Sequence, residues 1–414
     1  MTTETKIATS TKSPSVSARG RLVPASPIRK LAPFAEEAKL KGIHVYHLNI
    51  GQPDIETPAV MREQLKLISE KTYEYTPSGG TKAYVDSIRK YYEGLGIPLG
   101  AGEVLGTTGG SEALQFAFLA CADAGDEILI AEPFYTNYRA FAAIAGLEMV
   151  PLLSRGEDGF HLPPREEWEK ALTSRTKIVV ITNPNNPTGT IYAREELEMI
   201  AGFCRDHGLF LISDEVYREF VYDGACAVSA LTLSGMSDLV IVVDSLSKRY
   251  SACGIRLGAL CTRNPGVFEA VLHMAQGRLS PPGLAQAIAP AAASLGPDFY
   301  DGVVNEYQKR RDILYEGLTR IPGVFLRKPE GAFYFIARLP VEDTEDFARW
   351  LLTDFSLEGG TVMLAPAAGF YVTEGRGLNE VRIAYVLKGD DLLQAVKILA
   401  AALPAYQKAR GLRD

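Results

Sequence analysis

Three apolar runs along the chain are each followed by side chains that can take part in chemistry. The runs lie at 177–182, 209–213 and 239–244, and the side chains are Asn186, Asp214, Tyr217 and Lys248. In an open α/β sheet, ligands bind outside the carboxyl ends of the strands. If these runs are neighbouring strands, an amide, a carboxylate, a phenol and an amine meet at one edge of a sheet.

A second group of residues near the same edge predicts an anion site. The stretch TTGGSEAL places Gly110 and Ser111 at the start of a helix, where backbone N–H groups bind anions. Ser245 and Arg256, on either side of Lys248, add a hydroxyl and a guanidinium, which suit a phosphate. Each motif alone has an ordinary explanation as a turn, a helix cap or a solvated side chain. These explanations do not account for their meeting at one predicted edge.

One ligand, pyridoxal 5′-phosphate, accounts for all of these side chains together. A lysine amine forms a Schiff base with its aldehyde. A carboxylate opposite the ring nitrogen keeps that nitrogen protonated, so that the ring can take up electrons. The phosphate suits a helix N-terminus flanked by hydroxyls and an arginine. We expect burial and the nearby charge of Arg256 to lower the pKa of Lys248.

The motifs SLSK-x7-R, NNPTG, DEVY and EGAFY occur together with specific separations. On these motifs, the chain from about Ser26 to its C-terminus resembles the fold-type I, class I aminotransferases, and most of all their aspartate aminotransferase branch. The resemblance implies the α/β fold of the PLP-dependent transferases, with a mostly parallel central sheet covered by helices and a smaller α+β domain. It also implies transfer of an α-amino group to a 2-oxo acid by a ping-pong mechanism.

The resemblance assigns the cofactor-binding roles. Lys248 would carry the Schiff base and act as general acid and base, and Asp214 would pair with the ring nitrogen. The phenolic oxygen and the face of the ring would be held by Asn186, Tyr217 and Tyr135. The phosphate would be bound by Gly110, Ser111, Ser245, Arg256 and, across the interface of a homodimer with shared active sites, Tyr75.

The resemblance also assigns substrate-binding roles. Arg382 matches the arginine that grips the α-carboxylate of the substrate as a fork, with Gly51 beside that carboxylate. A dicarboxylic substrate needs a second cation, for which Arg278, Arg29 and Lys30 are the candidates. Some aspartate aminotransferases use an arginine near the position of Arg278, donated by the other subunit. The alternative for Arg278 is a surface position at a helix end, where cations are favoured.

Aspartate with 2-oxoglutarate is the first choice of substrates, among dicarboxylic or neutral L-amino acids more generally. Ile28 and Tyr75 could instead line an apolar pocket, which would favour aromatic or alanine substrates. The same fold and cofactor also support C–S lyases and cyclising lyases. The expected partners are therefore small amino acids and 2-oxo acids.

The elements that must position these residues alternate between strand and helix from about residue 104 to 262. The predicted strands lie at 127–131, 177–182, 209–213, 239–244 and 256–261, and predicted helices at 111–124 and 193–208. This alternation predicts a largely parallel sheet that is covered on both faces. Gly208 ends the second helix. Arg256 and Arg382 each fall inside a predicted strand.

The organisation of the chain predicts three parts. Residues 1–25 are rich in Ser and Thr and read as a disordered tail. Residues 54–305 form the large cofactor-binding domain. Residues 26–53 and 306–414 form a small domain that is built from both ends of the chain.

Composition excludes several function classes. The chain has 414 residues and a net charge of −7, which argues against binding to nucleic acid. It lacks an apolar run of the roughly 20 residues that a membrane span needs, and its start lacks a secretory h-region. The five cysteines and five histidines are scattered, which favours reduced thiols and disfavours a metal site. We expect a cytoplasmic protein without a metal.

Overall fold

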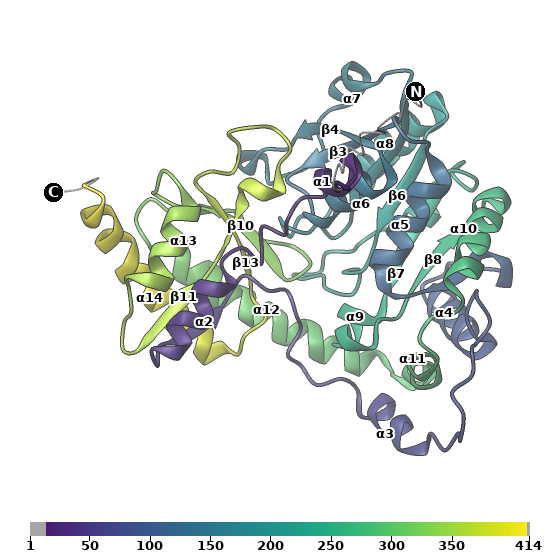
Figure 1. The fold of residues 1–414 in the computed structure, drawn as a ribbon, viewed down its shortest axis with the longest axis horizontal. Helices are drawn as coiled ribbons and strands as arrows, with labels where there is room; N and C mark the ends of the chain where they lie inside the picture. Colours follow the sequence, from purple (N-terminus) through teal and green to yellow (C-terminus); the bar gives the residue numbers. More distant parts are fainter. Residues whose placement is uncertain (1–13, 412–414) are drawn as a thin grey trace, which may run out of the picture.

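The computed structural model describes residues 14–411. Its central element is a seven-stranded sheet with the order β2-β8-β7-β6-β5-β3-β4 (Figure 1). The strands are β2 (Val104–Thr107), β3 (Glu127–Glu132), β4 (Glu148–Leu153), β5 (Thr176–Thr182), β6 (Phe210–Asp214), β7 (Val240–Ser245) and β8 (Gly258–Thr262). The run from β4 through β3, β5 and β6 to β7 is parallel, which confirms the predicted sheet and places the ends of β5, β6 and β7 side by side.

The strand β8 is antiparallel to both of its neighbours, β7 and β2. A parallel return needs a crossover of about a dozen residues or more, usually built around a full helix. The link from β7 to β8 contains only the four-residue helix α9 (Leu246–Arg249) and a 3₁₀ turn, so the chain folds directly back. This short return keeps Lys248 and Arg256 at the same end of the sheet.

Both faces of the sheet are buried. Ile178 and Val180 of β5 belong to one core, whereas Val179 and Ile181 belong to the other, as the two-residue period of a strand requires. The first core is completed by α5 (Gly109–Cys121), α6 (Asn137–Ala145) and α10 (Pro265–Arg278). The second is completed by α4 (Lys82–Gly94), α7 (Arg165–Ala171), α8 (Arg194–His207) and α11 (Gly283–Ile288).

Each predicted strand and helix is present, with bounds that differ by up to three residues, and the strands β2 and β4 were not predicted. Gly208 ends α8 in the left-handed conformation, with φ of 64°. Arg256 lies outside the predicted strand, because β8 begins at Gly258 and Arg256 itself has φ of 53° in the turn before it. The edge strand β4 was missed because it contains Pro151, which cannot donate to a ladder and is tolerated at a sheet edge.

The two ends of the chain meet in a second body. The strand β1 (His44–His47) pairs in parallel with β11 (Gly360–Met363), and α2 (Ala32–Leu40) contacts α13 (Thr344–Thr353) (Figure 1). A four-stranded antiparallel sheet contains β12 (Ala365–Pro366), β13 (Glu380–Ala384), β10 (Tyr334–Arg338) and β9 (Phe325–Leu326). The helices α12 (Pro297–Thr319) and α14 (Gly389–Ala409) pack against each other. The predicted domain boundaries themselves stay a prediction.

The N-terminal segment enters the fold before α2. Of the predicted tail, residues 1–13 lie outside the described residues, and Ala18–Leu22 form the short helix α1, capped by the hydroxyl of Ser17. A further helix, α3 (Ala59–Leu67), lies between the two bodies in sequence. None of the helices within residues 14–411 is long and apolar enough to cross a membrane.

Candidate active site

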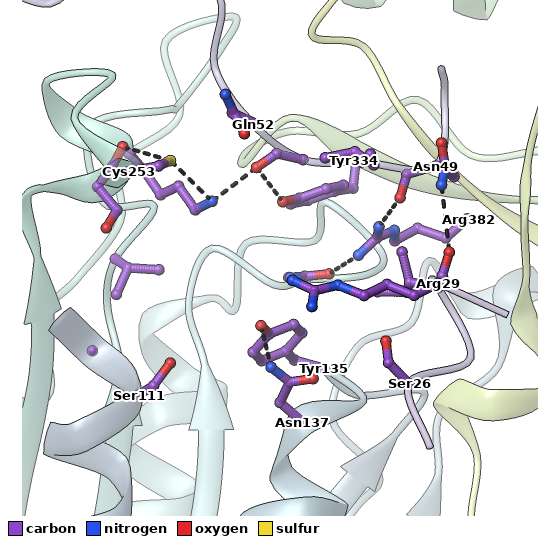
Figure 2. A pocket seen from close by; sticks show the side chains of 18 of the residues that line it. Ser26, Arg29, Asn49, Gln52, Ser111, Tyr135, Asn137, Cys253, Tyr334 and Arg382 are labelled. Atoms are coloured by element: carbon purple, nitrogen blue, oxygen red, sulfur yellow. Dashed lines mark hydrogen bonds between the residues drawn. The ribbon is translucent and has the colours of Figure 1, made fainter. Parts of the chain in front are cut away.

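A cavity of about 750 Å³ opens at the carboxyl ends of β5, β6 and β7, between the two bodies. Its wall includes the start of α5, the segment before and after α2, and β13 (Figure 2). Most of the predicted site residues line it, namely Gly51, Gly110, Ser111, Tyr135, Asn186, Asp214, Tyr217, Ser245, Lys248, Arg256 and Arg382. The parallel sheet thus brings together residues that are far apart in sequence.

Lys248 reaches into the cavity from α9. Its Nζ donates a hydrogen bond to the carbonyl oxygen of Gly51, 2.8 Å away, and lies 3.8 Å from Sγ of Cys253 (Figure 2). Burial lowers the pKa of Lys248, and the charges of Arg382 and Arg256 act in the same direction, while Cys253 opposes them. The direction expected from the sequence is confirmed, with Arg382 as a second contributor.

Arg249, the next residue, points into the interior on the other side of α9. Its guanidinium binds both carboxylate oxygens of Asp244, at 2.7 and 2.8 Å, and its Nε donates to Glu219 at 2.7 Å. The side chains of Arg249 and Asp244 are at most 1% exposed. These buried contacts of Nη2 and Nε with two carboxylates fix the short helix, and with it the direction in which Lys248 leaves the backbone.

Asp214 ends β6 and is buried. Its Oδ2 accepts a hydrogen bond from the hydroxyl of Tyr138 at 2.7 Å, and its Oδ1 accepts one from the N–H of Val216 at 3.4 Å. Burial raises the pKa of Asp214 to about 6, although both hydrogen bonds favour the ionised form. Among residues 14–411 the carboxylate has no cationic partner, and a protonated ring nitrogen would supply one.

A chain of polar contacts also lines the cavity and runs from Asn186 through Tyr217 to Tyr334. Asn186 Nδ2 donates to the hydroxyl of Tyr217 at 3.2 Å, and that hydroxyl lies 3.1 Å from the hydroxyl of Tyr334. Burial raises the pKa of Tyr217 well above its ordinary value. The phenol therefore stays protonated and can donate to an oxygen in the cavity.

Arg382 of β13 is a buried cation without an acidic partner among the described residues. Its guanidinium donates to the carbonyl of Asn49 at 2.6 Å and to Oδ1 of Asn186 at 3.3 Å, whereas its Nε has no partner in the described part of the chain (Figure 2). The ring of Tyr334 lies 4.6 Å away and that of Phe370 5.1 Å away. Burial lowers the pKa of Arg382. A buried, unpaired guanidinium is costly and suits an incoming carboxylate.

The start of α5 and the turn before β8 form a cradle. Gly109 has φ of 74°, and a Cβ there would lie 2.4 Å from Nη2 of Arg256. A Cβ on Gly258 would lie 2.9 Å from the backbone nitrogen of Gly110. Arg256 is held by the carbonyl of Cys253 at 2.9 Å. Glycines thus leave the helix N-terminus open beside a guanidinium, which suits a phosphate.

Tyr135 lines the cavity, and its hydroxyl accepts a hydrogen bond from Asn137 at 2.8 Å (Figure 2). Tyr75 and Arg278 do not line the cavity. Tyr75 is 79% exposed, and Arg278 binds Glu112 and the carbonyl of Gly106, both at 3.1 Å. The roles predicted for both residues involve a second subunit and stay predictions.

The family model "Aminotransferase class I and II" matches residues 43–399. The chain belongs to this family. It is 31% identical to the "Probable aspartate/prephenate aminotransferase" of Aquifex aeolicus over 91% of this chain and 96% of the relative. The fold is similar to that of a Thermus thermophilus aspartate aminotransferase mutant, with a TM-score of 0.86 and 27% identity over 94% of this chain and 100% of the other. It is also similar to the alanine aminotransferase of Pyrococcus furiosus, with a TM-score of 0.83 and 31% identity over 96% and 100%.

Class I and II aminotransferases use pyridoxal 5′-phosphate, and the residues of this member fit it. The open cradle beside Gly110 and Arg256 suits the phosphate, and the ring nitrogen would provide the cation that Asp214 lacks within the described part of the chain. Lys248 offers an amine whose pKa is lowered. None of these cavity residues has a charge that would repel the cofactor at the group it would face.

Sequence reasoning missed three residues of this aminotransferase site. Tyr138 of α6 donates a hydrogen bond to Asp214, which is 76 residues away in sequence, and no local signal pointed to this contact. Tyr334 is the last residue of the EGAFY motif and faces the cavity. Cys253 lies near Nζ of Lys248, and nothing in its sequence context distinguished it from the other cysteines.

Proposed function

We propose that the chain moves the α-amino group of an L-amino acid, with aspartate as the first choice, to a 2-oxo acid such as 2-oxoglutarate in a ping-pong cycle. The observation that carries this proposal is the buried guanidinium of Arg382, which faces the cavity of Lys248 and Asp214 without an acidic partner in the described chain. An amino acid supplies the carboxylate that this cation lacks, and it places its α-carbon near the amine.

The cofactor would be held at three points. Gly110, Ser111, Ser245 and Arg256 would bind its phosphate. Asn186 and Tyr217 would bind its phenolic oxygen, Tyr135 would stack on its ring, and Asp214 would pair with its ring nitrogen. When bound, pyridoxal 5′-phosphate supplies an electron sink for the bonds of the α-carbon.

Lys248 has two tasks in this proposal. Its amine would form the Schiff base that holds the cofactor, and when displaced it would take the proton from the α-carbon of the substrate and return a proton later. Both tasks need a neutral amine at neutral pH. Burial and the charges of Arg382 and Arg256 support this, because they lower the pKa of Lys248.

Arg382 would orient the substrate. Its two terminal nitrogens form a fork for the α-carboxylate, and the amide of Asn186 lies at the edge of that fork, 3.3 Å away. The rings of Tyr334 and Phe370 pack around the guanidinium and keep water from it. This fixes the direction of the α-hydrogen relative to Lys248.

The choice of aspartate is supported by the names of the relatives, which include aspartate and aspartate/prephenate aminotransferases. Alanine is the alternative that a similar solved structure favours, and an aromatic donor is another. A C–S lyase or cyclising lyase would also use this cavity. Release of product with and without an added 2-oxo acid separates the classes, because a lyase needs no acceptor.

Two copies of the chain would associate, with Tyr75 reaching the phosphate of the partner. This is supported by large apolar side chains that are exposed within ten residues before Tyr75 in sequence, namely Leu65, Leu67 and Tyr73. Sedimentation equilibrium would test it, since a monomer would remove Tyr75 from the site. A cytoplasmic location is part of the proposal, and the free cysteines agree with it.

The central experiment replaces Lys248. Protein loaded with pyridoxal 5′-phosphate and reduced with borohydride should carry the cofactor on the peptide that contains Lys248, and Lys248→Ala should lose both this adduct and turnover. The exposed Lys170, which pairs with Glu167, provides the control Lys170→Ala. An adduct on another lysine, or turnover of Lys248→Ala near that of the wild type, would refute the assignment.

A further inference from the structure

Three cations could receive the second carboxylate of a dicarboxylic substrate, and the structure separates them. Arg278 is engaged by Glu112 and lies outside the cavity wall. Lys30 pairs with Glu345 and also does not line the cavity. Arg29 lines the cavity and has no hydrogen-bond or ion-pair partner for its side chain among the residues that the structure describes.

Arg29 points inward. Figure 2 shows its side chain extended beneath Arg382, with the guanidinium above Tyr135. Burial raises the pKa of the Tyr135 hydroxyl, and the charges of Arg382, Arg256 and Arg29 oppose this rise. Arg29 therefore acts on the same space as the cation that would bind the α-carboxylate.

The backbone on both sides of Arg29 is anchored, which places its Cα at the wall of the cavity, while the side chain itself is exposed. The carbonyl of Ile28 accepts a hydrogen bond from Nδ2 of Asn49 at 3.4 Å. Pro27 packs on Gly369 so closely that a Cβ on that glycine would lie 2.5 Å from the proline ring. Lys30 is held on the outer side by Glu345. Arg29 thus stands between fixed neighbours on the entry to α2.

The other charged side chains of the cavity wall are already paired or assigned to another group, whereas Arg29 is not. Lys39 is neutralised by Glu36 at 2.7 Å, and burial lowers the pKa of His47, which favours its neutral form. The cofactor and the α-carboxylate would engage Arg256, Asp214 and Arg382. Because the reactive lysine works as a neutral amine, one cation remains for a second anionic group.

We propose that Arg29 is the specificity-determining residue that binds the side-chain carboxylate of a dicarboxylic amino or 2-oxo acid, supplied by the same chain that supplies Arg382. This inference rests on the proposed function, because it names the substrate class of that site. The ligand class is a short chain with a carboxylate at each end, one for Arg382 and one for Arg29.

The test compares amino donors in the first half-reaction alone. No dicarboxylic acceptor is then present, so the measured rates report only how Arg29 acts on the donor. Arg29→Gln should lower kcat/KM for aspartate by about 10- to 100-fold, the worth of one charge-assisted pair. The value for alanine should not change. Arg29→Lys should recover part of the loss, because it keeps the charge but not the fork. Lys30→Gln is the matched control and should behave as the wild type.

A second measurement does not depend on turnover. Calorimetric titration should show weaker binding of succinate, an unreactive dicarboxylate, to Arg29→Gln than to the wild type, with binding of propionate unchanged. Equal losses for aspartate and alanine would overturn the proposal, as would no loss at all. Loss of aspartate selectivity in Arg278→Gln instead of Arg29→Gln would overturn it too.

Failure of this inference is distinguishable from failure of the proposed function. If the wild type transfers amino groups from alanine or aromatic donors but not from dicarboxylic ones, the role of Arg29 is wrong and transamination stands. If the wild type transfers an amino group from no donor, the proposed function is wrong, and the succinate titration still reports on Arg29.

Discussion

The amine of Lys248 lies 2.8 Å from the carbonyl oxygen of Gly51, so the segment that leads out of β1 touches the reactive group supplied by the central sheet. This contact depends on the absence of a side chain at Gly51. A Cβ there would lie 1.7 Å from the hydroxyl oxygen of Tyr334. Glycine at this position therefore lets two elements of the second body approach the amine together.

Replacing Gly51 by alanine should disturb the site more than the fold. The new methyl group must displace Tyr334 and its contact with Tyr217, which would cost about 1–3 kcal/mol as overpacking. We expect a lower kcat and a slightly lower melting temperature. Gly302→Ala is the control, because that helical glycine has no heavy atom near its Cβ direction and should gain stability slightly. Wild-type kinetics of Gly51→Ala would contradict the steric argument.

Asp214→Asn should stabilise the ligand-free protein at high pH. The folded pKa is raised from 3.8 to about 6 by burial, so the ionised form is disfavoured in the fold and stability falls as the pH rises through this window. Two pKa units correspond to about 3 kcal/mol at pH 8, and the advantage of asparagine should shrink to about half near pH 5.

Thermal denaturation of ligand-free Asp214→Asn and wild type between pH 5 and 8 measures this difference. In the presence of the cofactor the order should reverse, because the variant loses the charge that pairs with the ring nitrogen. Asp214→Ala should keep the Schiff base between the cofactor and Lys248 but lose most activity. A difference in stability that does not vary with pH would rule out burial of the charge as its cause.

Arg382→Gln should lose at least about 100-fold in kcat/KM, because a charge-assisted fork to the substrate is removed. Its ligand-free stability should not fall, since the unpaired buried cation already disfavours folding. Steady-state kinetics and urea unfolding measure the two effects. Arg338→Gln is the control, because Arg338 lies on the adjacent strand and pairs with the exposed Glu157. It should change neither kcat/KM nor the free energy of unfolding strongly. A large loss of stability in Arg382→Gln would identify the residue as structural.

Arg249→Met should destabilise the fold by about 3–5 kcal/mol, because it leaves Asp244 as a buried charge with one cation fewer. Burial raises the pKa of Asp244, but Arg249 and Arg218 outweigh it and the pKa is lowered. Urea unfolding measures the loss. Arg249→Met combined with Asp244→Leu should recover part of it, since the buried charge of Asp244 is then removed, while Glu219 still loses its guanidinium partner. Equal instability of the single and double variants would contradict this reasoning.

The sequence predicted the sheet and the residues at its edge because the signals are local. Strongly apolar runs such as KIVVIT end abruptly in polar residues, and Gly208 marks a helix end. The position of Arg256 outside the strand was not predictable in this way, because its left-handed backbone depends on the short return between β7 and β8. Tyr138 was missed because its partner, Asp214, is brought to it by strand pairing.

The second cation illustrates the same limit. From the sequence, Arg278 was the first candidate and Arg29 and Lys30 were the further ones. They differ only in which acidic side chains the fold places beside them, namely Glu345 for Lys30 and Glu112 for Arg278. Such long-range neighbours leave no periodic trace in a single sequence.

The helix α9 places two adjacent basic side chains in different surroundings, Lys248 in the cavity and Arg249 beside the buried carboxylates. Because neighbouring residues on a helix face different directions, deleting one residue between Ser245 and Lys248 would place Arg249 at the position from which Lys248 enters the cavity. The cavity would then receive a permanently charged guanidinium, which cannot bond to an aldehyde. This stretch can therefore tolerate changes of residue type at some positions, but a change of its length would abolish activity even if Lys248 is kept.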